Sequence, residues 1–514
     1  MVQQESTSQT EIVPADPKAS QPHHARAHRG GSTMTLSCKS LSFLLFFSLF
    51  LSSPARGSVE AVQTLDLTGH FIGYFSLVIF IGAYLLVMLE EYTHMRKSKP
   101  VLLAAGIIWA GIAWIYATHD MPHAAEQAAR HNILEYAELF LFLLVAMTYI
   151  NAMEERNVFE TLRAKLVCSG MSFRMLFWIT GLLAFFISPV ADNLTTALLM
   201  GAVVLTLGKE EPRFIGLACI NIVVAANAGG AFSPFGDITT LMVWQKGVIA
   251  FQDFFVLFIP SVVNWLIPAF IMSFAVPGTK PASCEANISI KRGGKIVMLL
   301  FGLTIATAVS FHNFLHLPPM VGMMTGLAFL KFFGYYLKMT HQKYARKEIR
   351  YDPNKAEEVL GDTVPFDVFR RIARAEWDTL MFFYGIILCV GGLGFIGYLG
   401  SVSRVLYAGW GATSANIMIG ILSAIVDNIP VMFAVLTMVP EMSQGQWLLV
   451  TLTAGVGGSM LSIGSAAGVA LMGQARGHYT FFGHLKWTPI IALGYGASIY
   501  VHFLINAKSF LFFQ

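Results

Sequence analysis

The chain has 514 residues, of which 55% are hydrophobic and only 12% are Asp, Glu, Lys or Arg. Because a soluble domain carries about 25% charged residues, this composition excludes a disordered protein, a coiled coil and an ordinary soluble enzyme. The net charge of +4 is too small to indicate a nucleic-acid partner. The five cysteines form no CxxC pair, and Cys219 and Cys389 lie in apolar segments. We therefore expect small buried thiols, with no disulfide framework and no cofactor.

The first 57 residues are predicted to precede the membrane domain. Residues 1–33 are polar and are interpreted as a disordered or non-native extension. Residues 34–57 contain Met34, one lysine, a short apolar run and then small residues, which is the layout of a signal peptide. The run is shorter than the ~20 residues of a full span. An uncleaved anchor is the alternative interpretation.

Two sets of apolar segments follow in chain order. The first set lies at 71–89, 100–117, 132–152, 173–207, 213–246 and 254–276, and the second at 295–312, 318–338, 379–399, 404–440, 446–473 and 486–506. Segments 173–207 and 404–440 are too long for one crossing of ~20 residues, and each has a polar break in its middle. We therefore predict an all-α polytopic membrane protein in which these two segments form re-entrant helical hairpins.

Loop charge predicts how the segments are oriented. Lys and Arg are concentrated at 96–99, 156–174, 280–295 and 339–378, which the positive-inside rule places in the cytoplasm. The loops at 118–131, 313–317 and 441–445 are nearly free of Lys and Arg and are predicted to lie outside. Counting crossings then gives two repeats of inverted topology, at 65–276 and 295–514. A cytoplasmic linker at 277–294 joins them, and the second repeat includes the cytoplasmic loop 339–378.

The two halves also share motifs in the same order. Residues 188–193 (SPVADN) are matched by 423–428 (SAIVDN), 235 residues later. Downstream, the Gly-rich stretch 229–236 is matched by 457–464, 228 residues later. Inverted repeats with helices interrupted at corresponding positions are typical of secondary transporters.

Oxygen-bearing side chains are concentrated at these breaks. Backbone unwinds at membrane depth only where protein or water satisfies its polar groups, and carbonyl, carboxylate and hydroxyl oxygens suit Na⁺ or Li⁺. The candidates for ion binding or proton coupling are Asp192, Asn193, Asp237, Thr239, Asp427, Asn428, Ser462 and Ser465. For the hairpin aspartates the alternative is capping of the second half-helix. For the asparagines it is satisfaction of free backbone groups, and for the serines a bond within their own turn.

The third segment of each half contributes one more acidic residue. His131, Glu135 and Glu138 share one face of a helix, and Glu138 lies about 10 Å from its outer end, which favours a function. Asp378 opens the corresponding segment of the second half. Its alternative role is a first-turn carboxylate that the helix dipole stabilises.

These segments together resemble the NhaD-type sodium/proton antiporters of the ion transporter superfamily. The likeness is carried by 188–196 (SPVADNLTT), 227–240 (NAGGAFSPFGDITT) and 426–430 (VDNIP), and extends from about residue 65 to the end. The resemblance implies exchange of Na⁺ or Li⁺ for H⁺ by a homodimer. It assigns ion-handling or proton-linked roles to all the candidates above, with Na⁺ or Li⁺ at Asp192, Asn193, Asp427 and Asn428. It also makes His131 a candidate pH sensor.

Two other functions are alternatives to cation exchange. A transporter of a dicarboxylate or an oxyanion needs positive charge, whereas the motif segments contain acids and no Lys or Arg. An intramembrane aspartyl protease would use paired aspartates but has no need of an inverted duplication. We expect a bacterial inner (plasma) membrane, with a eukaryotic organelle as the alternative. The expected partners are monovalent cations, protons and the lipid bilayer.

Overall fold

Nearly all of the chain that can be described is helical. The computed structural model describes residues 64–93, 95–168, 170–208, 211–280, 288–351 and 368–511. The predicted extension at 1–33 and the predicted signal peptide at 34–57 lie outside these residues. Within them, ten helices are long and apolar enough to cross a membrane, which confirms the prediction of an all-helical protein with multiple spans.

The helices follow the predicted segments in order. Those of the first half are α2 (Phe71–Met88), α3 (Glu90–Thr93), α4 (Ser98–Thr118), α5 (Pro122–Glu155), α6 (Val158–Val167), α7 (Phe173–Ala191), α8 (Asn193–Leu207), α9 (Pro212–Gly230), α10 (Ile238–Gln245), the 3₁₀ helix η1 (Phe251–Leu257) and α11 (Phe258–Ser273). Those of the second half are α12 (Gly294–Leu315), α13 (Pro319–Tyr351), α15 (Val368–Ala373), α16 (Trp377–Phe395), α17 (Tyr398–Ser403), the π-helix η3 (Arg404–Gly409), α18 (Ala412–Ser423), α19 (Asn428–Met438), α20 (Gln444–Gly457), α21 (Ala466–Gln474), α22 (Phe481–Leu485), α23 (Thr488–Ile505) and the 3₁₀ helix η4 (Ala507–Phe510).

Both long segments are interrupted where the sequence predicts. Asp192 separates α7 from α8, and residues 424–427 separate α18 from α19. The helix before the second interruption, α18, begins later than the predicted segment 404–440, because residues 398–409 form α17 and η3. The stretch 118–131, expected as a loop, is helical from Pro122 onward, since proline is accommodated in a first helical turn. The loop 339–378 is likewise helical up to Tyr351 and again in α15.

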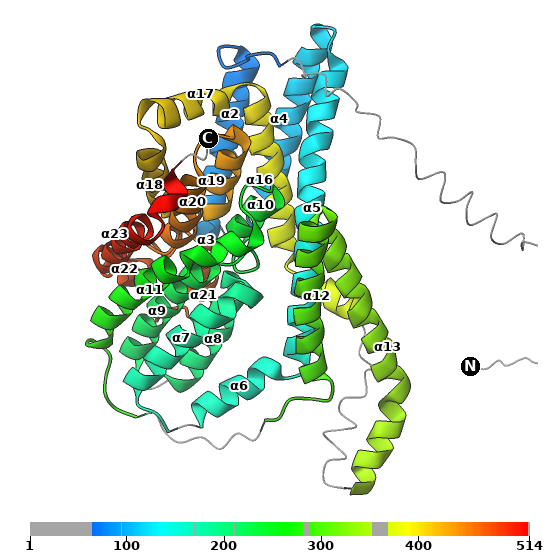
Figure 1. Ribbon diagram of the computed structural model, residues 1–514, viewed down its shortest axis with the longest axis vertical. Coiled ribbons are helices and arrows are strands. Elements are labelled where there is room, and N and C mark those ends of the chain that lie inside the picture. Colours follow the sequence, from blue (N-terminus) through cyan, green and yellow to red (C-terminus); the bar gives the residue numbers. More distant parts are fainter. Residues whose placement is uncertain are drawn as a thin grey trace, which may run out of the picture. The chain divides into compact units, whose positions relative to one another are not determined.

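The described helices form two groups that pack mainly within themselves. In the α5 group, α5 packs against α12, α13, α15 and α16, and α4 packs against α2 and α16. In the α9 group, α9 packs against α7, α8, α11, α20 and α21, and α19 packs against α10 and α20. The two groups meet chiefly where α16 packs on α19. In Figure 1, α5, α12 and α13 lie on one side and α7, α8 and α9 on the other.

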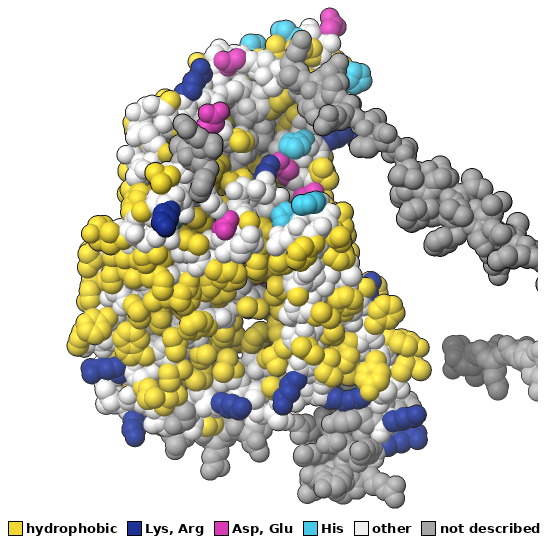
Figure 2. All heavy atoms as spheres, in the orientation of Figure 1, with side chains coloured by type: hydrophobic (Ala, Val, Ile, Leu, Met, Phe, Trp, Pro, Cys, Tyr) yellow, Lys and Arg dark blue, Asp and Glu magenta, His cyan; other side chains and the backbone are white. Residues whose placement is uncertain are grey.

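The surface has the character of a membrane protein. Large apolar side chains are exposed, for example Phe332 at 76% and Leu299 at 72%. Figure 2 shows a broad band of hydrophobic side chains, with Lys and Arg along its lower edge and with Asp, Glu and His, together with some Lys and Arg, above it. The basic lower edge is what the positive-inside rule expects of the cytoplasmic side.

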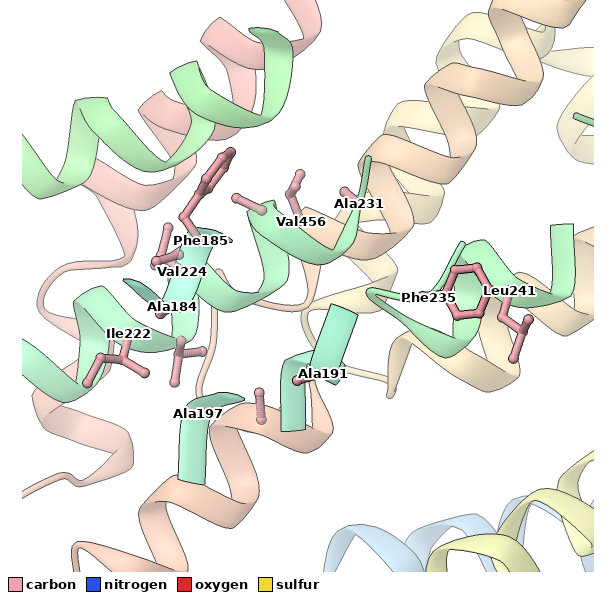
Figure 3. Close-up of a cluster of buried hydrophobic side chains, with 14 of the residues drawn as sticks. Ala184, Phe185, Ala191, Ala197, Ile222, Val224, Ala231, Phe235, Leu241 and Val456 are labelled. Carbon is pink, nitrogen blue, oxygen red and sulfur yellow. The ribbon is translucent and has the colours of Figure 1, made fainter. Parts of the chain in front are cut away.

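Small residues allow the helices of the α9 group to approach closely near the breaks. Figure 3 shows Ala184, Ala191, Ala197 and Ala231 among the buried side chains there. A Cβ atom on Gly229 would lie 2.2 Å from the carbonyl oxygen of Phe185. The corresponding position of the second half, Gly457, would place its Cβ 2.1 Å from the carbonyl oxygen of Gly420. The repeated glycines therefore let a backbone touch a backbone.

Candidate functional site

Each helix break ends in a polar side chain that caps the helix after it. The cap accepts a hydrogen bond from a backbone N–H of the first turn, at 2.8 to 3.5 Å. The four capping residues are Asp192 for α8, Asp237 for α10, Asp427 for α19 and Ser465 for α21. The capping role is thus confirmed for Asp192 and Asp427. The second carboxylate oxygen of Asp192 also accepts a hydrogen bond, from Thr195 Oγ1 at 2.9 Å.

The serine that begins each repeated motif makes the same contact in both halves. Ser188 Oγ donates to the carbonyl oxygen of Ala226 at 2.6 Å, and Ser423 Oγ donates to that of Ala454 at 2.7 Å. Both acceptors lie in the last turn before an unwound stretch. The two serines therefore fix the helix before each interruption, α7 or α18, against the helix that precedes the Gly-rich break.

Asp237 is one of the points at which the two halves of the chain meet. Its side chain is 3% exposed, and its Oδ2 accepts hydrogen bonds from Asn193 Nδ2 at 3.0 Å and from Asn428 Nδ2 at 2.9 Å. Asn193 Nδ2 also donates to Asn227 Oδ1 at 3.0 Å, and Asn227 Nδ2 donates to Ser465 Oγ at 3.0 Å. These five side chains form one buried network, which we call the Asp237 network.

A cavity of about 380 Å³ opens onto this network. Asp192, Asn193, Asp237 and Asn428 line the cavity at the network. The other charged side chains in its wall are Glu154, Glu160, Glu376 and Arg374. Because acidic residues outnumber basic ones, the electrostatic potential inside the cavity favours a cation over an anion.

The remaining candidates at the breaks are buried but contribute differently. Thr239 is fully buried, and its hydroxyl has no hydrogen-bond partner among the described residues. A buried polar atom of this kind is costly unless something satisfies it, so the hydroxyl is available to a ligand. Ser462 is also buried, and its Oγ lies 3.6 Å from Met472 Sδ. Asp427 is held through its backbone N–H, which donates to Tyr84 Oη of α2 at 3.0 Å.

The acidic residues of the third segments lie apart from the Asp237 network. Among the described residues, no hydrogen bond of the network reaches Glu138 or Asp378. Glu138 is half-buried in α5, and Asp378 accepts a hydrogen bond from Ser98 Oγ at 2.5 Å. His131 is mostly exposed, and its Nε2 lies 2.9 Å from Glu135 Oε1. Their proposed roles therefore require paths other than a direct contact in this arrangement.

Several residues of the site were not predicted from the sequence, among them Asn227, Glu154 and Glu376. Asn227 lies inside the motif 227–240, and an asparagine among small apolar residues near the end of a buried helix could have marked it. Glu154 and Glu376 lie next to basic loops, so nothing in their local sequence indicates that they face a cavity. Cys219 and Cys389 are buried free thiols, as predicted.

Comparison with known proteins identifies the family. A family model described as "Citrate transporter" matches residues 75–455. The Na(+)/H(+) antiporter NhaD of Alkalimonas amylolytica is 61% identical over 467 residues, covering 90% of this chain and 96% of the relative. That of Vibrio cholerae is 60% identical over 474 residues, covering 91% and 98%. Sodium/proton antiporter 1 of Arabidopsis thaliana is 31% identical, covering 82% of this chain and 71% of the relative.

These relatives are transporters and not enzymes, in agreement with the many spans of the fold. The chain is a multi-pass membrane protein that belongs to the citrate transporter family as that model defines it and, within this family, to the NhaD-type Na⁺/H⁺ antiporters.

Proposed function

We propose that this chain exchanges Na⁺ or Li⁺ for H⁺ across a bacterial inner membrane, with cation and proton competing for the carboxylates at the helix breaks. The observation that carries the proposal is the Asp237 carboxylate, which lies at an acidic cavity and accepts amide donors from both halves of the chain. Removing a carboxylate from water disfavours its charged form. A bound Na⁺ or a bound proton each relieves that cost.

The ligand set we propose combines oxygens from both halves. Asp192, Asn193, Asp427 and Asn428 hold the cation directly, with Asp237, Thr239, Ser462 and Ser465 completing the polar environment. Four helix N-termini converge on these residues, so each positive helix end stabilises a carboxylate or orients a hydroxyl. Glu138 and Asp378 are assigned to proton coupling, and His131 to pH sensing. For these three residues the support is the resemblance and, for Glu138, its half-buried position.

Alternating access requires the site to face each side of the membrane in turn. We interpret α7–α8 and α18–α19 as re-entrant hairpins of two inverted repeats, 65–276 and 295–514, joined by the linker 277–294. The support is the pair of matched motifs, the matched caps and the matched serine contacts described above. Movement of the α9 group against the α5 group would carry the hairpin tips past α16. The homodimer stays a prediction, which mass measurement in detergent or nanodiscs would test.

The experiment that tests the function uses proteoliposomes with an acidic interior and a pH-sensitive dye inside. Na⁺, Li⁺, K⁺ and succinate are added outside in turn. Cation/proton exchange predicts alkalinisation of the interior with Na⁺ or Li⁺ only. Coupled uptake of succinate without a response to Na⁺ would keep the fold and replace the function with dicarboxylate transport.

Two substitutions connect the function to the site. Asp192→Asn and Asp427→Asn should each abolish the Na⁺ response while the protein still purifies as a single species. Normal exchange by both variants would contradict the proposed ligand set but not the exchange function itself.

A further inference from the structure

An ion pair connects the end of α10 to α5. It lies on the opposite side of the Asp237 network from Glu154. The helix α10 begins after Asp237 and is followed by Lys246, so this lysine lies one short helix of about 12 Å from the site. Lys246 Nζ contacts Glu135 Oε1 of α5. The Glu135 side chain is 18% exposed and that of Lys246 is 35% exposed. An ion pair this shielded from water is screened less by salt than a fully exposed one.

An aromatic layer separates this ion pair from the cavity. Phe142, Phe235 and Trp244 are all buried. Their ring centroids lie 5.3 Å apart for Phe142 and Phe235, 5.7 Å for Phe235 and Trp244, and 6.4 Å for Phe142 and Trp244. Phe142 and Phe235 also line the cavity. The cavity is thus closed by aromatic rings toward Lys246.

The position along α5 shows which side is closed. Glu135 precedes Phe142 by two turns, or about 10 Å, whereas Glu154 follows it by more than three turns in the wall of the cavity. Glu154 lies next to the basic residues 156–174, which the positive-inside rule assigns to the cytoplasm. The ion pair and the aromatic layer therefore lie between the site and the external side, and the open part of the cavity leads toward the cytoplasm.

The two helices joined by this ion pair belong to different packing groups. The helix α5 packs with α12, α13, α15 and α16, whereas α10 packs on α19 and α20. A movement of one group against the other would separate Lys246 from Glu135. In contrast, the ion pair Glu126–Arg130 lies within α5, with 2.8 Å between Oε1 and Nη2, and is unaffected by such a movement.

We propose that Lys246 and Glu135 are positioning residues that hold Asp237 in its cytoplasm-facing arrangement and separate when the site turns outward. The inference rests on the proposed exchange function. Lys246 acts through α10, because the short helix transmits the position of its outer end to Asp237 at its inner end. The ion pair therefore sets how often the site faces the cytoplasm, and it does not touch the transported ion.

The first test breaks and then reverses the ion pair. Everted membrane vesicles expose the cytoplasmic face, so the Na⁺ concentration at half-maximal exchange reports the cytoplasm-facing population. Glu135→Gln and Lys246→Met should each raise this concentration about two- to fivefold, the size expected for a partly buried pair. The double variant Glu135→Lys/Lys246→Glu should return it to within about twofold. Neutralising Glu126 and Arg130 in the same way should leave it unchanged.

The second test prevents positions 135 and 246 from moving apart. In a background with all five native cysteines replaced, cysteines at positions 135 and 246 are joined by a short, reducible bifunctional thiosulfonate. Exchange should stop on cross-linking and return on reduction. Cysteines at Glu126 and Arg130, joined by the same reagent, should keep full exchange because both lie on one helix.

The outcomes separate this inference from the function on which it rests. Full exchange by the cross-linked 135/246 protein, or a charge-reversed variant no better than the single variants, would overturn the positioning role. Absence of Na⁺-dependent exchange in the unmodified protein would instead overturn the proposed function.

Discussion

Asp237→Asn replaces one oxygen of a buried carboxyl group with an amide nitrogen and leaves the shape of the side chain unchanged. In the native chain Oδ2 accepts from Asn193 at 3.0 Å and from Asn428 at 2.9 Å, and Oδ1 accepts from the Thr239 N–H at 3.2 Å. All three partners are donors. An asparagine offers only one acceptor oxygen, so it cannot satisfy both sides.

The less costly orientation of the new amide keeps its oxygen toward Asn193 and Asn428. Its NH₂ group then faces the Thr239 N–H, which leaves both of these buried donors without an acceptor. Each such group costs about 1–3 kcal/mol of folding free energy. For a chain of this size that corresponds to a fall of a few °C in the melting temperature. The protein should therefore still fold and insert.

Exchange should be affected much more than stability. The asparagine carries no charge to bind Na⁺ and releases no proton, so the Na⁺ response of the proteoliposomes should fall below detection. Asp253→Asn is the matched control. Asp253 Oδ2 also accepts a hydrogen bond from a side-chain amide, that of Gln444 at 2.6 Å, but Asp253 lies at the surface. Near-normal exchange by Asp237→Asn, at equal protein content, would refute the role given to this carboxylate.

Three further predictions follow from the same geometry. Gly236→Ala should lower the melting temperature and suppress exchange, since its Cβ would lie 2.6 Å from Gly230 Cα and overpacking costs about 1–3 kcal/mol. In the same thermal scan Gly496→Ala should be neutral or stabilising, because its Cβ meets nothing within 4 Å. Ser465→Ala should raise the Na⁺ concentration at half-maximal exchange several-fold, because Asn227 Nδ2 loses its acceptor, and Ser465→Thr should preserve it; equal values for the two variants would contradict this. Na⁺ at 100 times its dissociation constant should stabilise the purified protein by about 2.7 kcal/mol, an effect that shrinks as the pH falls, and no shift relative to choline chloride would argue against a bound cation.

The helices and their breaks could be predicted because they depend on local sequence. Apolar length located the spans, and the motifs at 188–193 and 423–428 located both interruptions. The helical start of α5 at Pro122 differs from the predicted loop, because a polar stretch that is nearly free of Lys and Arg has no apolar pattern that would mark it as a helix. The extension of α13 to Tyr351 was missed for a similar reason, because a charged helix beyond the membrane has no hydrophobic pattern.

The contacts of the site could be predicted only in part. The matched motifs indicated that residues of the two halves meet, and the structure brings Asn193, Asn428 and Asp237 together as that pairing suggests. The bond from Asn227 to Ser465 joins positions 238 residues apart, and no periodicity encodes it. The ion pair between Glu135 and Lys246 is equally long-range, and each residue by itself is an ordinary interfacial charge.

The capping positions of the two Gly-rich breaks carry a further consequence. Asp237 and Ser465 are equivalent by the 228-residue offset, yet one is an acid and the other an alcohol. If the halves are inverted copies, identical copies would make the two orientations of the carrier equivalent by a twofold rotation about an axis in the membrane plane, and therefore equal in free energy. The unequal pair removes that degeneracy. The binding site of an empty carrier would then face one side of the bilayer more often than the other. Without any regulatory ligand, the exchange fluxes in the two directions would differ under ion gradients of equal size and opposite sign.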